Sequence, residues 1–359
     1  MSDREEIVRK EYKRRKQYKL LFLIIVFAAL LAMTVIALAT GSAPVGVPDL
    51  ADLLKGSAPE FTSRVVYHVR MPRIAGAILA GIALSVSGAV IQSLLRNPLA
   101  SPYTLGISGS SAFGAAFAII VLGAGGSYTG SNDVATVVNP YILTLSAFVW
   151  SLLAVAVILM LSRFRGAGPE IIILAGIIIS SLFGAGISAM QYFADDVQLA
   201  SIVFWTFGDL GRANWANVLI IGVTAVAVLI YFFFHIWNYK ALQSGDEYAG
   251  SIGVNVRYVR LAGMVVASLA TAVVVSFYGV IAFVGLVVPH IVRRITGGEE
   301  QFLIPASALF GGLFLLSSDT LARTIIAPVV LPVGILTSFL GAPLFLFLLV
   351  RGMNRTYWQ

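Results

Sequence analysis

The sequence predicts an all-α polytopic membrane protein with about ten transmembrane helices. Of its 359 residues, 58% are hydrophobic and only 11% are charged, whereas about a quarter of the residues of a soluble domain carry charge. Apolar runs of about 20 residues, enough to cross a hydrocarbon core of about 30 Å, recur along the whole chain. We expect spans near 20–39, 74–95, 105–123, 141–161, 171–193, 217–237, 261–277, 280–292, 303–322 and 331–350. Nine or eleven spans are the alternatives, because the eighth is short and contains Pro289.

The positive charges predict that both termini lie in the cytoplasm. With the N-terminus placed there, 18 of the 24 lysine and arginine residues fall in cytoplasmic segments, as the positive-inside rule requires. The chain then divides into a basic cytoplasmic N-terminal tail (1–19), a transmembrane domain (20–351) with a cytoplasmic loop at 238–260, and a cytoplasmic C-terminal tail (352–359). A polybasic tail beside a membrane is typical of contact with anionic lipid. The net charge of +7 therefore requires no nucleic-acid partner.

A weak internal repeat predicts two inverted blocks of four helices. Arg73-Ile74-Ala75-Gly76 opens the second span, and Arg260-Leu261-Ala262-Gly263 opens the seventh. The blocks formed by spans 2–5 and 7–10 start five spans apart, so the second enters the membrane from the opposite side. Inverted repeats of this kind are common in transport folds.

Composition argues against catalytic residues, a cofactor or a metal in this chain. Cysteine is absent and the three histidines, His68, His235 and His290, are far apart in sequence, so no cluster has metal-ligand spacing. The phosphate-binding pattern Gly-Lys-Ser/Thr occurs nowhere, and no loop brings a nucleophile and a base together in sequence.

The source of energy for transport is expected to lie outside this chain. The hydrophobic cores of the expected spans lack Asp, Glu, Lys, Arg and His, and Asp319 falls near the end of its span. Ion-driven carriers often keep an ionisable group inside the bundle. An ion-coupled secondary carrier of a small solute, or an integral-membrane enzyme, are the alternatives to a permease driven by another subunit.

Two connecting segments and several glycines predict local structure. Asp246 and Glu247 precede a short helical stretch, as is typical of a helix N-terminus, and Gly253 ends it. The apolar segment 199–207 predicts a short helix lying in the membrane interface. Small residues let membrane helices approach closely; those of the second and fifth spans are Gly76, Gly81, Gly88, Gly176, Gly184 and Gly186.

Three long motifs lie in order between about residues 64 and 351. They are Arg70-Met71-Pro72-Arg73 with 88–92 and Asn97-Pro98-Leu99-Ala100-Ser101-Pro102; the run 279–294, which contains Pro289-His290; and Leu331-Pro332-Val333-Gly334 with Gly341-Ala342-Pro343. In this order they resemble the permeases of the FecCD family, the ATP-binding cassette importers of iron–siderophore complexes, haem and cobalamin. Two stretches depart from the family pattern and leave the subfamily open, 298–301 and 207–210.

The resemblance implies a permease subunit in the cytoplasmic membrane of a prokaryote that pairs with a second permease copy. Two cytoplasmic ATPase subunits would bind ATP and Mg, and an extracytoplasmic binding protein would deliver a bulky metal chelate, namely a ferric siderophore, haem or cobalamin. No cofactor is expected in this chain itself. The binding protein would largely set which chelate is carried.

The resemblance also implies roles for individual residues. Arg70, Arg73 and Arg323 would dock the binding protein, with interfacial anchoring as the structural alternative. Asn97 and Leu99 would form a cytoplasmic gate, with a helix-capping turn as the alternative. A second gate would fall near Pro169 and Glu170, which do not match the small hydroxyl residues of the family, so that role is not assigned. Contact with the ATPase subunit would come from Gly245, Asp246, Glu247, Ala249, Ile252, Gly253 and Val254.

Overall fold

A computed structural model describes residues 3–41, 43–124, 126–127, 136–137, 139–161 and 169–352. This part of the chain is a helical bundle with one short antiparallel hairpin, in which β1 (Gly126–Ser127) pairs with β2 (Thr136–Val137). The predicted all-α class is confirmed. The helices are α1 (Asp3–Ala39), α2 (Val47–Leu54), α3 (Glu60–Arg64), the π-helix η1 (Val65–Arg70), α4 (Met71–Leu94), α5 (Ile107–Ile120), α6 (Pro140–Leu161), α7 (Pro169–Phe193), α8 (Asp196–Thr206), the 3₁₀ turn η2 (Leu210–Arg212), α9 (Trp215–Phe234), α10 (Ile236–Gln243), α11 (Asp246–Ser251), α12 (Val256–Tyr278), α13 (Val284–Thr296), α14 (Glu300–Thr324) and α15 (Val333–Gly352).

Seven helices in the described part are long and apolar enough to cross a membrane. They are α1, the column formed by α3, η1 and α4, and then α6, α7, α9, α12 and α14. Two further apolar helices, α5 and the greater part of α15, are shorter. The multi-span membrane architecture predicted from the sequence is therefore confirmed.

Helical structure extends further than the sequence predicted on the N-terminal side of the first two spans. Residues 3–19 of the predicted tail are helical and continue directly into the first span. The second span does not begin at residue 74, because α3, η1 and α4 form one column that starts at Glu60. Of the predicted C-terminal tail, residues 353–359 lie outside the described residues.

The predicted eighth span begins four residues late because the chain is not helical between α12 and α13. Gly279 and Phe283, at the two sides of this break, have φ values of 75° and 66°, which a right-handed helix cannot contain. Beside the break, the amide of Asp209 donates to the Tyr278 carbonyl at 2.8 Å and the amide of Gly334 donates to the Gly208 carbonyl at 3.2 Å. Irregular backbone at membrane depth is tolerated where protein buries it or where it lines a cavity.

Helix α4 occupies the centre of the bundle, and its glycines explain how closely its neighbours approach. A Cβ on Gly81 would lie 2.3 Å from the Gly311 carbonyl oxygen of α14. A Cβ on Gly88 would lie 1.7 Å from the Gly285 carbonyl oxygen of α13. The predicted packing role is confirmed at both positions. Gly184 of α7 packs against no other helix of the described part of this subunit, because an added Cβ would meet nothing within 4 Å.

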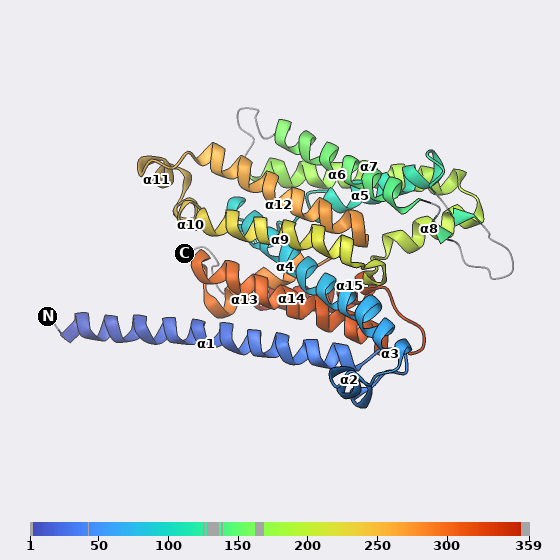
Figure 1. Cartoon of the computed structure of the whole chain (residues 1–359). Coiled ribbons are helices and arrows are strands. Elements are labelled where there is room, and N and C mark those ends of the chain that lie inside the picture. The colour runs from blue at the N-terminus through green and yellow to red at the C-terminus, as the bar shows by residue number, and fades with distance from the viewer. Residues whose placement is uncertain are drawn as a thin grey trace.

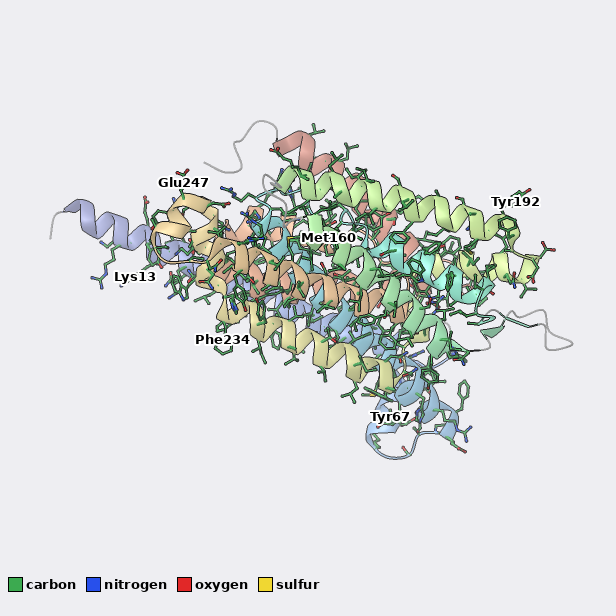
Figure 2. All side chains as sticks on the ribbon, turned by 90° about the horizontal axis from the view of Figure 1, so that it is seen from above. Lys13, Tyr67, Met160, Tyr192, Phe234 and Glu247 are labelled. Carbon is green, nitrogen blue, oxygen red and sulfur yellow. The ribbon has the colours of Figure 1, made fainter. Side chains whose placement is uncertain are left out.

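The long helices run side by side, so the molecule has two distinct ends (Figure 1). Helices α10 and α11 lie at the end where α1 begins, which we call the α11 end. Helices α2, α3 and α8 lie at the opposite end, which we call the α2 end. Figure 2 shows Lys13 and Glu247 at the α11 end, with Tyr67 and Tyr192 at the α2 end.

Candidate functional site

A buried ionic cluster at the α2 end joins α4 to α14. The Arg73 guanidinium donates to both carboxylate oxygens of Asp319, at 2.8 and 3.0 Å. Arg323 Nε lies 3.2 Å from the same carboxylate, one turn along α14, and Arg73 is also 3.6 Å from Asp209. Asp319 is fully buried, and a buried carboxylate is tolerated only when it is paired. The two arginines provide that pairing.

Two arginines of this region donate hydrogen bonds to backbone carbonyls at the C-terminal end of α1 and just after it. Arg70 donates to the carbonyls of Val45 at 2.9 Å and Ala43 at 3.0 Å, and to that of Leu38. Arg323 donates to the Thr40 carbonyl at 3.1 Å. The last carbonyls of a helix lack partners within the helix, and a positive charge there also suits the helix dipole. Arg70 and Arg323 therefore hold the end of α1 against the bundle.

The predicted docking residues Arg70, Arg73 and Arg323 lie together at one end of the molecule, but they are only 3%, 8% and 4% exposed. Their charged groups face partners inside the subunit in this conformation. Contact with a binding protein stays a prediction. Asp319, the shared partner of Arg73 and Arg323, was expected only near the end of its span and was not predicted as a site residue, although a lone carboxylate in an apolar run was a usable signal.

The predicted gate residues form a compact turn after α4, at the α11 end. The Asn97 side-chain oxygen accepts a hydrogen bond from the Leu99 amide at 2.8 Å, and the Ala100 amide donates to the Asn97 carbonyl at 3.1 Å. The capping turn is therefore present. The Leu99 side chain is 44% exposed, so it is free to contact a second subunit, and its role as a gate stays a prediction. The position of the second gate adjoins residues 162–168, which lie outside the described part.

The predicted short helix of the cytoplasmic loop is present as α11. Gly245 precedes it with a φ of 114° and Gly253 follows it with a φ of 90°, so both turns use conformations that favour glycine. Ala249 is buried, whereas Ile252 is 55% exposed. Val254 packs against the hydrophobic core of the bundle. Val254 therefore contributes to the packing of the loop on the bundle, and contact of the predicted residues with an ATPase subunit stays a prediction.

A second buried polar cluster at the α11 end was not predicted as a site. Glu300 is fully buried and accepts hydrogen bonds from Ser93 and Gln243, both at 2.5 Å. Gln243 also donates to the Gly298 carbonyl at 3.0 Å, and Arg293 donates to Ser93 at 3.3 Å. The cluster ties α10 to α4, α13 and α14. In the sequence, the residues around Glu300 stood out only as a departure from the family pattern.

A cavity of about 550 Å³ lies beside the break between α12 and α13. It opens onto the surface of the subunit, where Tyr103 is 50% and Phe339 74% exposed. Aromatic side chains, hydroxyl groups and backbone line it, and the described residues around it carry no charge. Its lining includes Tyr103, Phe207, Val280, Gly334, Ser338 and Phe339. The cavity is therefore an open, mainly apolar hollow without a charged group among the residues that line it.

Comparison with known proteins decides the family. A family model described as the FecCD transport family matches residues 29–351. The chain belongs to this family. As a FecCD permease it is the non-catalytic transmembrane subunit of a prokaryotic ATP-binding cassette importer, and it is a multi-pass membrane protein.

The similarity extends over almost the full length of the relatives. A Methanocaldococcus jannaschii protein assigned as an ABC transporter permease is 51% identical over 345 residues, which cover 96% of this chain and 98% of that protein. The hemin transport system permease protein HmuU of Yersinia pestis is 36% identical, with 89% and 94% covered. The solved inward-facing structure of an ABC transporter assigned to the metal-chelate type superposes with a TM-score of 0.80 and 30% identity, over 92% of this chain and 98% of that one.

Proposed function

We propose that this FecCD permease carries a bulky metal chelate, namely a ferric siderophore, haem or cobalamin, across the cytoplasmic membrane by alternating access. Relatives 30–36% identical to it are named for hemin, for vitamin B12 in Vibrio vulnificus, and for Fe(3+)-citrate and iron(3+)-hydroxamate in Bacillus subtilis. These solutes share a metal ion held in a large organic chelate. Transport would move the solute without changing it chemically.

The observation that carries this proposal is the cavity at the break between α12 and α13. Its volume of about 550 Å³ lies within the range of about 300–1,000 Å³ typical of small-molecule sites. It is lined by aromatic rings and backbone and opens on the surface of the subunit. A second copy facing that surface would turn the open cavity into an enclosed path.

A second permease copy is also supported by the exposed face of α7. Gly184, Ser181 and Ser188 are exposed there, although small and hydroxyl residues are typical of helix–helix interfaces in membranes. We therefore place the partner copy against α7 and the cavity beside it.

The finer topology is part of the proposal. Adding α5, α13 and α15 to the seven long helices gives ten spans. Helix α4 starts at Met71 near the α2 end, and α12 starts at Val256 near the α11 end, which supports two inverted blocks. Basic residues of α1 such as Lys13 lie at the α11 end (Figure 2). The positive-inside rule therefore favours a cytoplasmic location for the α11 end and for both termini.

Three kinds of partner follow from this orientation. Two ATPase subunits, which would hold ATP and Mg, would dock at α11, and an extracytoplasmic binding protein would dock at the α2 end.

Helix α1 has 37 residues and is therefore about 55 Å long, longer than a hydrocarbon core of about 30 Å. The basic N-terminal part of α1 would extend out of the hydrocarbon core and contact anionic lipid head groups.

Purification of the tagged chain from its native membrane tests this proposal. We expect stoichiometric ATPase subunits to stay bound, and the associated binding protein to bind one of four probes: haemin, cyanocobalamin, ferric citrate or a ferric hydroxamate. If the chain purifies alone and still transports a solute in vesicles without ATP, it is a secondary carrier and the proposal is wrong.

A further inference from the structure

The carboxylate of Asp246, the first residue of α11, faces two arginines from other elements. Its Oδ1 lies 3.2 Å from Nη2 of Arg96, which follows α4. Nη2 of Arg260, on α12, donates to both carboxylate oxygens at 3.0 Å. The turn after α4 and the start of α12 therefore both contact the carboxylate at the start of α11.

Arg96 is part of the turn that contains the predicted gate residues. Its φ is 46°, a left-handed value that is uncommon for a residue other than glycine. The Arg96 amide donates to the Ser93 carbonyl at 3.3 Å, and the Asn97 amide donates to the Gln92 carbonyl at 3.1 Å. These bonds tie the turn to the last turn of α4, so a force on the Arg96 side chain acts on the whole turn.

Arg260 reaches the same turn by a second route. Its Nε donates to the Leu94 carbonyl at 3.2 Å, which caps the last turn of α4. Asp246 therefore holds the end of α4 directly through Arg96 and indirectly through Arg260. When α11 moves, either both contacts break or the end of α4 moves with it.

We propose that Asp246, with Arg96 and Arg260, transmits movement of α11 to the gate turn Asn97–Leu99. This inference rests on the proposed function, in which an ATPase subunit moves α11. Asp246 is 40% and Arg96 37% exposed, and exposed ion pairs contribute little to stability. The residues are thus positioning residues, whose loss uncouples the turn from α11 without unfolding the subunit.

The absence of cysteine from the chain permits a direct test with Leu99→Cys as a reporter in the complex with the ATPase subunits. The rate of N-ethylmaleimide labelling is measured without nucleotide and in the state trapped with ATP, Mg and orthovanadate. We expect trapping to change the rate about threefold or more in the reporter variant, because two conformations populated differently expose the turn differently. An equal labelling rate with and without trapping would overturn the proposal, because the turn would then not move.

Adding Arg96→Asn to the reporter should abolish the response while ATP hydrolysis and subunit assembly persist, because Arg96 lies outside the predicted contact with the ATPase subunit. Asparagine tolerates a left-handed φ, so this change removes the guanidinium without adding backbone strain. Asp246→Asn should also abolish the response, and Asp246→Glu should restore it. Arg257→Gln is the matched control, because Arg257 is exposed one turn before Arg260 on the same helix, and it should leave the response intact.

The outcomes separate this inference from the proposed function. If no ATPase subunit binds the chain, the proposed function fails. If the ATPase subunits bind and hydrolyse ATP, and the labelling response survives Asp246→Asn and Arg96→Asn, only the link through Asp246 is wrong.

Discussion

Asp319 is the buried counter-ion of Arg73 and Arg323 at the α2 end. The sequence located Arg70, Arg73 and Arg323 at one end of the molecule from charge and motif. It could not show that they are buried, because burial depends on which carboxylate and which helix end pack beside them. A charged residue near the boundary of a span predicts which side of the membrane that residue lies on. Only the fold shows which group the charge is paired with.

Asp319→Asn should destabilise the subunit strongly. It leaves Arg73 and Arg323 without their buried counter-ion, and breaking a buried pair costs about 3–5 kcal/mol. Thermal unfolding in detergent measures the loss. Glu60→Gln is the control, because its ion pair with Arg64 is 73% and 79% exposed and should contribute less than about 0.5 kcal/mol. Equal melting temperatures for the two variants would show that the cluster is not structural.

Leu99→Ala should raise passive leak through the assembled permease, because truncation of the exposed side chain widens the turn at the cytoplasmic end. Leak is measured as uptake of cyanocobalamin and of a ferric hydroxamate into proteoliposomes without ATP. Leu122→Ala, another exposed leucine (50%), should leave the leak unchanged. An unchanged leak in Leu99→Ala would make Leu99 a packing residue.

Individual elements were predicted best where the apolar run is long and uninterrupted. Helix α11 was also predicted, because an acidic pair marks its start and Gly253 marks its end. The break at 279–283 was not, since its apolar residues look like helix in sequence. Its extended backbone is stabilised by contacts with Gly208 and Gly334, which lie far away in the chain.

Ile252→Asp should detach the ATPase subunits. The side chain is exposed on α11, and a charge buried in an apolar contact would weaken binding by about 2 kcal/mol, which is about 30-fold in affinity. Co-purification measures the effect. Val47→Asp places the same change on an exposed residue of α2 (68%) and should keep the ATPase bound. Normal binding by Ile252→Asp would refute the role of α11.

The ion pair between Lys19 and Glu299, at 2.8 Å, should stabilise the contact of α1 with the start of α14 in a pH-dependent way. Burial alone would raise the pKa of Glu299, but hydrogen bonds from Lys19 and Gln301 and the nearby positive charges lower it overall. Because the folded pKa lies below the unfolded value of about 4.3, the contribution is present above that pH and is lost as the pH falls through the folded pKa.

Glu299→Gln should therefore lower the melting temperature at neutral pH, by the equivalent of about 0.5 kcal/mol for a partly exposed pair. The difference from the unmodified chain should disappear in acid, once the pH has fallen below the folded pKa of Glu299. Glu11→Gln, on the exposed part of α1, is the control and should show no such dependence. A difference that persists unchanged in acid would mean that packing, not charge, links the two helices.

The two ends of the molecule are built differently. The α2 end is held by buried arginines, and the α11 end carries a short exposed helix between two glycine turns. A cavity beside irregular backbone lies between them. Composition and charge were enough to predict a membrane-spanning helical bundle, whereas the cavity arises from segments that meet only in the fold.

Uptake by the purified complex in vesicles, with ATP confined to the α11 side, distinguishes an ATP-driven importer from a secondary carrier. The chelate that its binding protein retains is supplied on the α2 side. We expect accumulation only with hydrolysable ATP, and none with a non-hydrolysable analogue or with an ion gradient alone. Equal accumulation without ATP, driven by an ion gradient, would contradict this expectation and make the chain a secondary carrier.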